Sequence, residues 1–325
     1  MKIKPTVLAV LNESKNRLQN AGIDNPGLAA EILVAARLNC PRLELYRRTN
    51  ENLTSAQIAA IKAGTRRLEK HEPIQYVLGQ TDFMGRVFKC DSRALIPRPE
   101  TEELVECVIG HEPLRQIDRP AIIDIGTGSG CIIVSLALRM KNGNFWAVDV
   151  SAGAIELAAE NARANNVADK IRFLTADFAL LRQSSVLGFP LRSDSFRLRQ
   201  GYAGQVGGQF AGFRPSFTGR EIPSGMDAVV ANPPYVRAAD FAGLEKNVRL
   251  WEPRLALDGG ADGLQVIRPL VQKAYEILKP DRFLFLEIGF DQWPAVQHLL
   301  AETGFSRGCV RPDCSGHNRL VMAVK

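Results

Sequence analysis

The chain is predicted to be an α/β protein in which a mostly parallel, seven-stranded sheet follows a small helical module. Three observations predict this fold class. Short apolar runs alternate with helical stretches from residue 121 onward. A glycine-rich turn separates the first of these runs from a helix. The first 73 residues instead carry apolar side chains at helical spacing. Continuous apolar strands between helices are typical of a parallel sheet that helices cover on both faces.

Residues 1–73 are expected to form a bundle of helices. Apolar residues recur at helical spacing in Ala29–Leu38, after the start signal Asn25-Pro26. Another helix is expected to open at Thr54 and to continue through Leu68. This module carries no chemical motif of its own, so we expect its apolar stripes to pack on each other.

Residues 74–97 are expected to be short extended pieces that link the bundle to the sheet. The segment Phe83–Phe88 resembles a β-hairpin with a glycine at its turn. The segment Leu95–Glu102 is a proline-stiffened loop, and it is expected to enter a helix that runs through Val108.

The sheet itself is expected within residues 98–325. The predicted strands are Ala121–Ile125, Phe145–Val150, Ile171–Ala176, Asp227–Ala231 and Arg282–Ile288, and a final pair near Ser306–Val310 and Arg319–Val324 adds an antiparallel hairpin. The stretch Leu181–Gly225 breaks this alternation, because it is rich in Gly, Arg, Ser, Phe and Gln without a sustained period. A compact domain does not need a structureless connection of this length, so we expect a largely disordered inserted surface loop at 181–225.

Composition and charge argue against several classes of protein. Hydrophobic residues make up 46% and charged residues 23%, as in an ordinary soluble protein. No apolar stretch is long enough to span a membrane, and the first residues lack a signal-peptide core, so a cytoplasmic location is expected. The six cysteines form no C-x-x-C pair, which predicts neither a metal site nor a disulfide framework.

The net charge of +6 is concentrated in one part of the chain. The segment between Leu181 and Met226 contains six arginines and two acidic residues, so it alone contributes a net charge of +4. The remaining chain carries about +2, which is not the broad basic footprint of a protein that binds duplex DNA. We therefore expect no stable nucleic-acid binding. A monomer without membrane binding is also expected.

The tetrapeptide Asn232-Pro233-Pro234-Tyr235 directly follows an apolar strand. Two consecutive prolines cannot donate ladder hydrogen bonds, so the strand must end here in a stiff turn. The Asn side-chain oxygen and a Pro carbonyl can accept both N–H bonds of a planar NH2 group, and Tyr235 can stack on its flat face. The nitrogen is then held facing an electrophile, which is catalysis by positioning. A plain Asn-Pro turn is the alternative.

A glycine-rich turn, Gly126-Thr127-Gly128-Ser129-Gly130, follows the first strand and opens a helix. Glycines let the backbone turn tightly and approach a ligand closely. The third glycine comes one residue too early for the dinucleotide-binding fingerprint. This spacing is better matched to S-adenosylmethionine, which has no pyrophosphate, although a strand–helix turn without a ligand is the alternative.

Two further residues lie after neighbouring strands. Asp149, at the end of the second strand, can accept hydrogen bonds from both hydroxyls of a ribose, or it can cap the following helix. Asp177-Phe178, after the third strand, can bind the edge of an adenine and cover its face, whereas core packing is the alternative for Phe178 alone.

The sequence closely resembles the HemK/PrmC family, the protein-(glutamine-N5) methyltransferases that modify peptide-chain release factors. The matching segments cover nearly the whole chain: Pro73–Tyr76, Phe83–Phe88, Leu95–Glu102, Asp124–Gly130, Asn161, Asn232–Tyr235, Glu252-Pro253, Glu287–Gly289 and Asp313–Arg319. Asn232–Tyr235 alone is shared with DNA enzymes that methylate amino groups, whereas Ile96–Glu102 is far more specific.

The resemblance implies a Rossmann-like class I methyltransferase domain over residues 98–325, behind an N-terminal helical substrate-recognition domain and a β-hairpin linker. It implies that Gly126–Gly130, Asp149 and Phe178 bind S-adenosyl-L-methionine. It also implies that Asn232 lies beside both cofactor and substrate, and that Asn232–Tyr235 hold the Gln amide of a Gly-Gly-Gln loop. The chain departs from the family in two ways: the family usually has Trp in place of Phe178, and it lacks the 181–225 insertion.

The expected chemistry needs positioning more than acid–base catalysis. The sulfonium methyl is already activated, so the enzyme must supply mainly orientation and desolvation to a weakly nucleophilic amide nitrogen. We therefore assign no general base, and Glu287 is left between an active-site role and a structural one. The alternatives are a glutamine methyltransferase acting on a ribosomal protein, a DNA adenine-N6 methyltransferase, and a non-catalytic binding protein whose insertion blocks the site.

Overall fold

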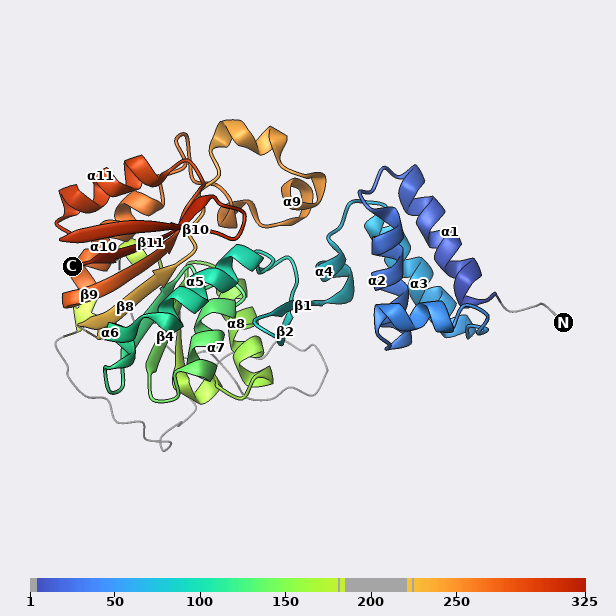
Figure 1. Ribbon diagram of the computed structural model, residues 1–325, viewed down its shortest axis with the longest axis horizontal. Helices are drawn as coiled ribbons and strands as arrows, with labels where there is room; N and C mark the ends of the chain where they lie inside the picture. Colours follow the sequence, from blue (N-terminus) through green and yellow to red (C-terminus); the bar gives the residue numbers. More distant parts are fainter. Residues whose placement is uncertain (1–4, 181, 185–220, 224) are drawn as a thin grey trace, which may run out of the picture.

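The computed structural model describes residues 5–180, 182–184, 221–223 and 225–325. Figure 1 shows a helical module at one end of the molecule and a sheet with helices on both faces at the other, joined by a short hairpin. None of the described helices is both long enough and apolar enough to cross a lipid bilayer.

The N-terminal module is helical, as predicted. It comprises α1 (Val7–Asn20), α2 (Pro26–Leu38), the 3-10 helix η1 (Arg42–Arg47) and α3 (Ser55–Leu68). The side chains of Thr54 and Gln57 form a capping box that fixes the start of α3. The apolar faces of these helices pack into a core of their own, separate from those of the sheet.

The linker differs from the prediction at its start. Residues Ile74–Leu78 form the short helix α4, not an extended piece, and the hairpin of β1 (Gln80–Phe83) and β2 (Arg86–Lys89) follows. A helix of five residues is not stable alone. It forms here because Arg37 and Arg67 of the bundle both donate hydrogen bonds to the carbonyl oxygen of Val77, at 3.0 and 3.2 Å.

The large sheet has seven strands in the order β10-β11-β9-β8-β3-β4-β5. The strands are β3 (Ala121–Ile125), β4 (Asn144–Asp149), β5 (Ile171–Thr175), β8 (Met226–Ala231), β9 (Leu278–Glu287), β10 (Arg307–Pro312) and β11 (Asn318–Val324). The five from β9 to β5 are parallel, and β11 runs antiparallel to both β9 and β10. The predicted fold class is confirmed, although β9 begins four residues earlier than Arg282.

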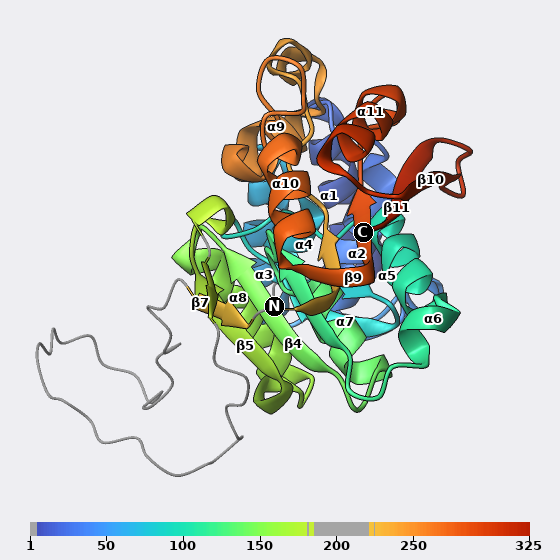
Figure 2. The ribbon, with the colours of Figure 1, turned by 90° about the vertical axis from the view of Figure 1, so that its left-hand side faces the viewer.

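Helices cover both faces of this sheet (Figure 2). One face packs against α5 (Pro99–Gly110), α7 (Cys131–Arg139) and α8 (Ala152–Ala164). The other packs against α10 (Ile267–Ile277) and α11 (Trp293–Thr303). The short helices α6 (Glu112–Arg115) and α9 (Lys246–Trp251) lie in connections. The central strands are therefore buried on both sides, which explains their continuous apolar sequences.

Most of the predicted 181–225 insertion lies outside the described residues. Its described ends pair with each other in parallel, as β6 (Arg182–Ser184) and β7 (Glu221–Pro223). These two short strands leave the prediction of a largely disordered insertion untested, so it stays a prediction. The pairing joins segments far apart in the sequence, so no local pattern could indicate it.

Candidate active site

The predicted site residues gather at one edge of the sheet, where the parallel strands β5, β4, β3 and β8 end side by side. The chain builds β3, β4 and β5 in one direction and then crosses to β8 on the other side of β3. Such a reversal of strand order leaves a crevice at the carboxyl ends of the strands, where α/β proteins bind ligands.

The glycine turn lies between β3 and α7. Gly126, Gly128 and Gly130 have φ angles of 75°, 54° and 79°, which favour glycine. A Cβ at Gly130 would also lie 2.8 Å from the Cβ of Ala158 on α8, so this position requires close packing. At Gly126, by contrast, an added Cβ would meet no atom within 4 Å. The turn thus packs tightly against the protein at one end and exposes its backbone at the other.

Asp124, in β3, supports the glycine turn through a hydrogen bond with Thr127. Its carboxylate is fully buried and accepts a hydrogen bond of 2.6 Å from the hydroxyl of Thr127, which is itself buried, as is Ser129. Burial raises the pKa of Asp124 to about 7, and the Thr127 hydrogen bond only partly opposes this. No described residue donates to the other carboxylate oxygen, Oδ1.

Asp149 ends β4 next to the turn. One of its carboxylate oxygens accepts from the backbone N–H of Gly128 and the other from that of Ser151, both at 2.9 Å. The side chain that caps α8 is Ser151, which accepts from the N–H of Ala154. Burial raises the pKa of Asp149, against the effect of its backbone donors. The residue whose side chain caps α8 is therefore Ser151 and not Asp149. Asp149 instead contacts the glycine turn through the N–H of Gly128.

Phe178 follows β5 in the short 3-10 helix Phe178–Leu180. Its ring is half-buried and packs against the core on the α10 face of the sheet. The neighbouring Asp177 is exposed, and its carboxylate accepts from the N–H of Ala179. Both residues lie at the expected edge of the sheet, and their roles toward an adenine stay predictions.

Asn232 directly follows β8 and is partly buried, and Pro233 behind it is buried. The Asn232 side-chain NH2 donates to the Thr101 hydroxyl at 2.9 Å, and that hydroxyl donates to Glu287 at 2.7 Å. Thr101 and Glu287 are both buried, with 3% and 1% of their surface exposed. Burial raises the pKa of Glu287 to about 7, while Thr101 and Arg319 oppose this rise. The structural role is thus the one that the geometry supports for Glu287.

Tyr235 closes the turn that begins at Asn232. Its hydroxyl lies 3.5 Å from the Arg319 guanidinium, which pairs with the buried Asp313 at 2.9 Å. Its carbonyl accepts from the side-chain amide of Gln292 at 3.2 Å. Burial raises the pKa of Tyr235 to about 12, so the phenol remains protonated near neutral pH. The ring is therefore oriented from both ends, next to Pro234.

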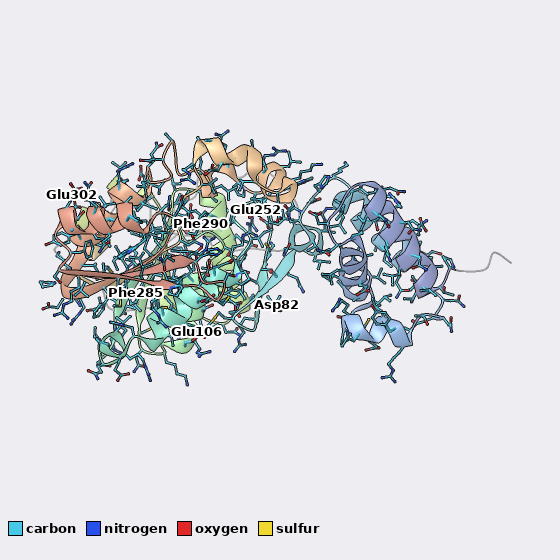
Figure 3. All side chains as sticks on the ribbon, turned by 45° about the horizontal axis from the view of Figure 1, so that its top comes forward. Asp82, Glu106, Glu252, Phe285, Phe290 and Glu302 are labelled. Carbon is cyan, nitrogen blue, oxygen red and sulfur yellow. The ribbon has the colours of Figure 1, made fainter. Side chains whose placement is uncertain are left out.

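Sequence reasoning named Asn161, Glu252 and the segment that contains Thr101, but it did not predict the contacts by which they support these side chains. Thr101 was part of the specific Ile96–Glu102 segment, but nothing in that segment indicated its partner. Glu252 is buried and accepts from the N–H of Ile96 and from Arg98, which anchors the same segment. Figure 3 shows Glu252 on the side of the sheet domain that faces the helical module. Asn161 similarly ties the hairpin to the glycine turn through Lys89 and Ser129.

Comparisons with known proteins agree with this arrangement. Residues 9–79 match the PrmC N-terminal domain family, past the predicted boundary at residue 73, and residues 122–189 match a methyltransferase domain family. The chain is 35% identical over 321 residues to the release factor glutamine methyltransferase of Moorella thermoacetica, covering 98% of this chain and 99% of that protein.

Two further relatives carry the same description. The protein of Geobacter sulfurreducens is 33% identical over 316 residues, which cover 97% of this chain and 95% of the relative. That of Chlorobaculum tepidum is 35% identical over 284 residues, covering 86% and 84%. Because similarity of this degree extends over both the helical module and the sheet domain, the chain belongs to the release factor glutamine methyltransferase family.

Proposed function

We propose that this protein transfers the methyl group of S-adenosyl-L-methionine to the side-chain N5 of the glutamine in the Gly-Gly-Gln motif of peptide-chain release factors. One observation carries the proposal beyond family membership. The amide of Asn232 is held at the end of β8 with its NH2 group hydrogen-bonded to Thr101, beside the strand that leads into the glycine turn. This arrangement supports a role for Asn232 as an amide acceptor next to the candidate cofactor site.

The residues around the glycine turn fit S-adenosyl-L-methionine. The open space beside Gly126 lets a ligand approach the backbone. The Asp149 carboxylate is fixed by Gly128 and Ser151 and retains acceptor capacity for two ribose hydroxyls. Phe178 would cover the adenine ring. The cofactor supplies an activated methyl group on a sulfonium.

The substrate amide would be held by Asn232–Tyr235. The Oδ1 atom of Asn232 and the carbonyl of Pro233 would accept its two N–H bonds, and the Tyr235 ring would stack on its plane. In the transfer, a C–N bond forms as the S–C bond of the sulfonium breaks, which leaves a neutral thioether. The surplus proton leaves the nitrogen afterwards, so the protein contributes orientation and exclusion of water.

The test is methyl transfer from isotopically labelled cofactor to a purified release factor. We expect label in the wild-type Gly-Gly-Gln substrate and none in a Gln→Ala substrate. Asn232→Ala should lower kcat by on the order of a hundredfold or more, with a much smaller change in cofactor affinity. Label in the Gln→Ala substrate, or preferential labelling of a ribosomal protein in a parallel reaction, would contradict the proposal.

A further inference from the structure

We infer that Thr101 is a positioning residue for methyl transfer, and that it determines which side of the Asn232 amide faces the substrate. This inference rests on the proposed function, because it assigns the direction of the hydrogen bonds that would hold the glutamine amide.

Three elements bring the participating side chains together. Thr101 lies in the first turn of α5, Glu287 ends β9 and Asn232 follows β8. In the sheet, Ala231 is paired with Leu286, so Asn232 and Glu287 come next on adjacent strands. Thr101 reaches both from the helix that packs over this edge, at 2.7 Å from Glu287 and 2.9 Å from Asn232.

The direction of these hydrogen bonds follows from counting protons. An ionised Glu287 can only accept, so the single hydroxyl proton of Thr101 is committed to it. The hydroxyl oxygen can then only accept from Asn232, which must present its Nδ2 and not its Oδ1.

The opposite side of the amide is consequently left for the substrate. No described residue donates a hydrogen bond to Oδ1 of Asn232. If the Asn232 amide were reversed, its NH2 group would face the NH2 group of the substrate glutamine. Its Oδ1 would then face the Thr101 hydroxyl, whose only proton is already donated to Glu287. Fixing the amide before the substrate arrives is a form of preorganisation.

The position of Thr101 is itself secured by the segment before α5. The buried carboxylate of Glu252 accepts from the N–H of Ile96 at 3.0 Å and pairs with the Arg98 guanidinium. Pro99 then begins α5, with its φ angle already suited to a helix. Thr101 therefore lies in a helix whose preceding segment is anchored to the buried Glu252, which limits its freedom to move away from Asn232.

The test compares Thr101→Val, which has nearly the same shape without a hydroxyl, with Thr101→Ser, which keeps the hydroxyl. The assays are run well above the pKa of about 7 that burial gives Glu287. Thr101→Val should lower kcat about ten- to a hundredfold. The KM for release factor and the cofactor dissociation constant should change by no more than about twofold. Thr101→Ser should regain most of the lost kcat.

A double-mutant cycle distinguishes positioning from a general structural effect. If Thr101 acts through Asn232, adding Thr101→Val to Asn232→Ala should cause little further loss of kcat. Multiplied losses in the double variant, or a kcat near wild type in Thr101→Val, would overturn the inference while leaving the proposed function intact. Absence of transfer by the wild-type protein would overturn the proposed function itself, and this role with it.

Discussion

At the scale of single residues, three carboxylates lie near the carboxyl ends of strands β3, β4 and β9, and they differ in their partners. Asp124 accepts from one hydroxyl, Glu287 from Thr101, and Asp149 from two backbone N–H groups. Burial raises the pKa of all three. Of the three, only Asp149 is fixed by backbone N–H donors beside the glycine turn. Asp149 is therefore the carboxylate best suited to bind a ligand.

Asp149→Ala should weaken cofactor binding about ten- to a hundredfold, because a carboxylate makes charge-assisted hydrogen bonds to ribose hydroxyls. Calorimetric titration of S-adenosylmethionine measures this change. Ser151→Ala is the matched control, since it removes the cap of α8 and should cost about 1 kcal/mol of stability with little change in affinity. An unchanged dissociation constant in Asp149→Ala would place the ribose elsewhere.

Asp124 should make stability depend on pH. Its pKa is raised from 3.8 to about 7 by burial, so the folded state binds more protons than the unfolded state between these values. Its stabilising contribution is thus complete at low pH and is lost as pH rises through about 7. Asp124→Asn should remove this dependence. As pH rises, the free energy of unfolding of the variant should therefore increase relative to that of wild type, by up to about 1.4 kcal/mol per pH unit. Urea unfolding at several pH values checks this, and a constant difference would contradict it.

At the scale of elements, the site depends on close packing between α7 and α8. Gly130 is the N-cap residue of α7 and lies against Ala158 on α8, while Asn161 of α8 binds the backbone of both the glycine turn and β2. One helix thereby positions the cofactor turn and also attaches the hairpin that leads to the N-terminal module. A change in the separation of these helices would disturb both.

Gly130→Ala should lower the free energy of unfolding more than Gly22→Ala does. Both glycines have positive φ angles, of 79° and 70°, so both substitutions incur about 1 kcal/mol of backbone strain. Only at Gly130 would the new Cβ meet Ala158, at 2.8 Å, which adds about 1–3 kcal/mol of overpacking. If denaturant unfolding gave equal losses of unfolding free energy for the two variants, α7 and α8 would be able to move apart without loss of stability, which would contradict this prediction.

At the scale of the whole molecule, the helical module and the sheet domain are two parts with separate hydrophobic cores. The helical module has its own core, and every candidate cofactor residue lies in the sheet domain. The two parts are linked by few polar contacts, among them a 3.0 Å hydrogen bond from the Trp251 indole to the carbonyl of Lys70. We therefore propose that the module binds the release factor outside its glutamine loop.

Removing residues 1–72 tests this division. The shortened protein should bind the cofactor with nearly unchanged affinity. Its KM for intact release factor should rise about tenfold or more, because a second contact raises the effective concentration of the reacting loop. Transfer to a short Gly-Gly-Gln peptide is the control and should change little. Equal KM values for the intact substrate would contradict a recognition role.

The sequence by itself determined the features that depend on local chemistry. The strands of the sheet were predicted because buried parallel strands require continuous apolar runs. The glycine turn was predicted because positive φ angles and close contacts exclude other residues, and the end of β8 because Pro233 and Pro234 cannot continue a ladder. The places of Asp149 and Phe178 at or after the ends of their strands, together with the family resemblance, predicted their roles toward a cofactor, and those roles stay predictions.

Only the tertiary structure decided which distant residues meet. Thr101 lies 131 residues from Asn232 and 186 from Glu287, so no periodicity could connect them. The helix α4 was likewise not predicted, because arginines of the bundle stabilise it. The pairing of β6 with β7 was not predicted either, because it joins segments that are far apart in the sequence. Local patterns indicate which backbone conformations a segment favours. The partners that complete its hydrogen bonds are set by packing, because they come from elements that approach one another only in the folded chain.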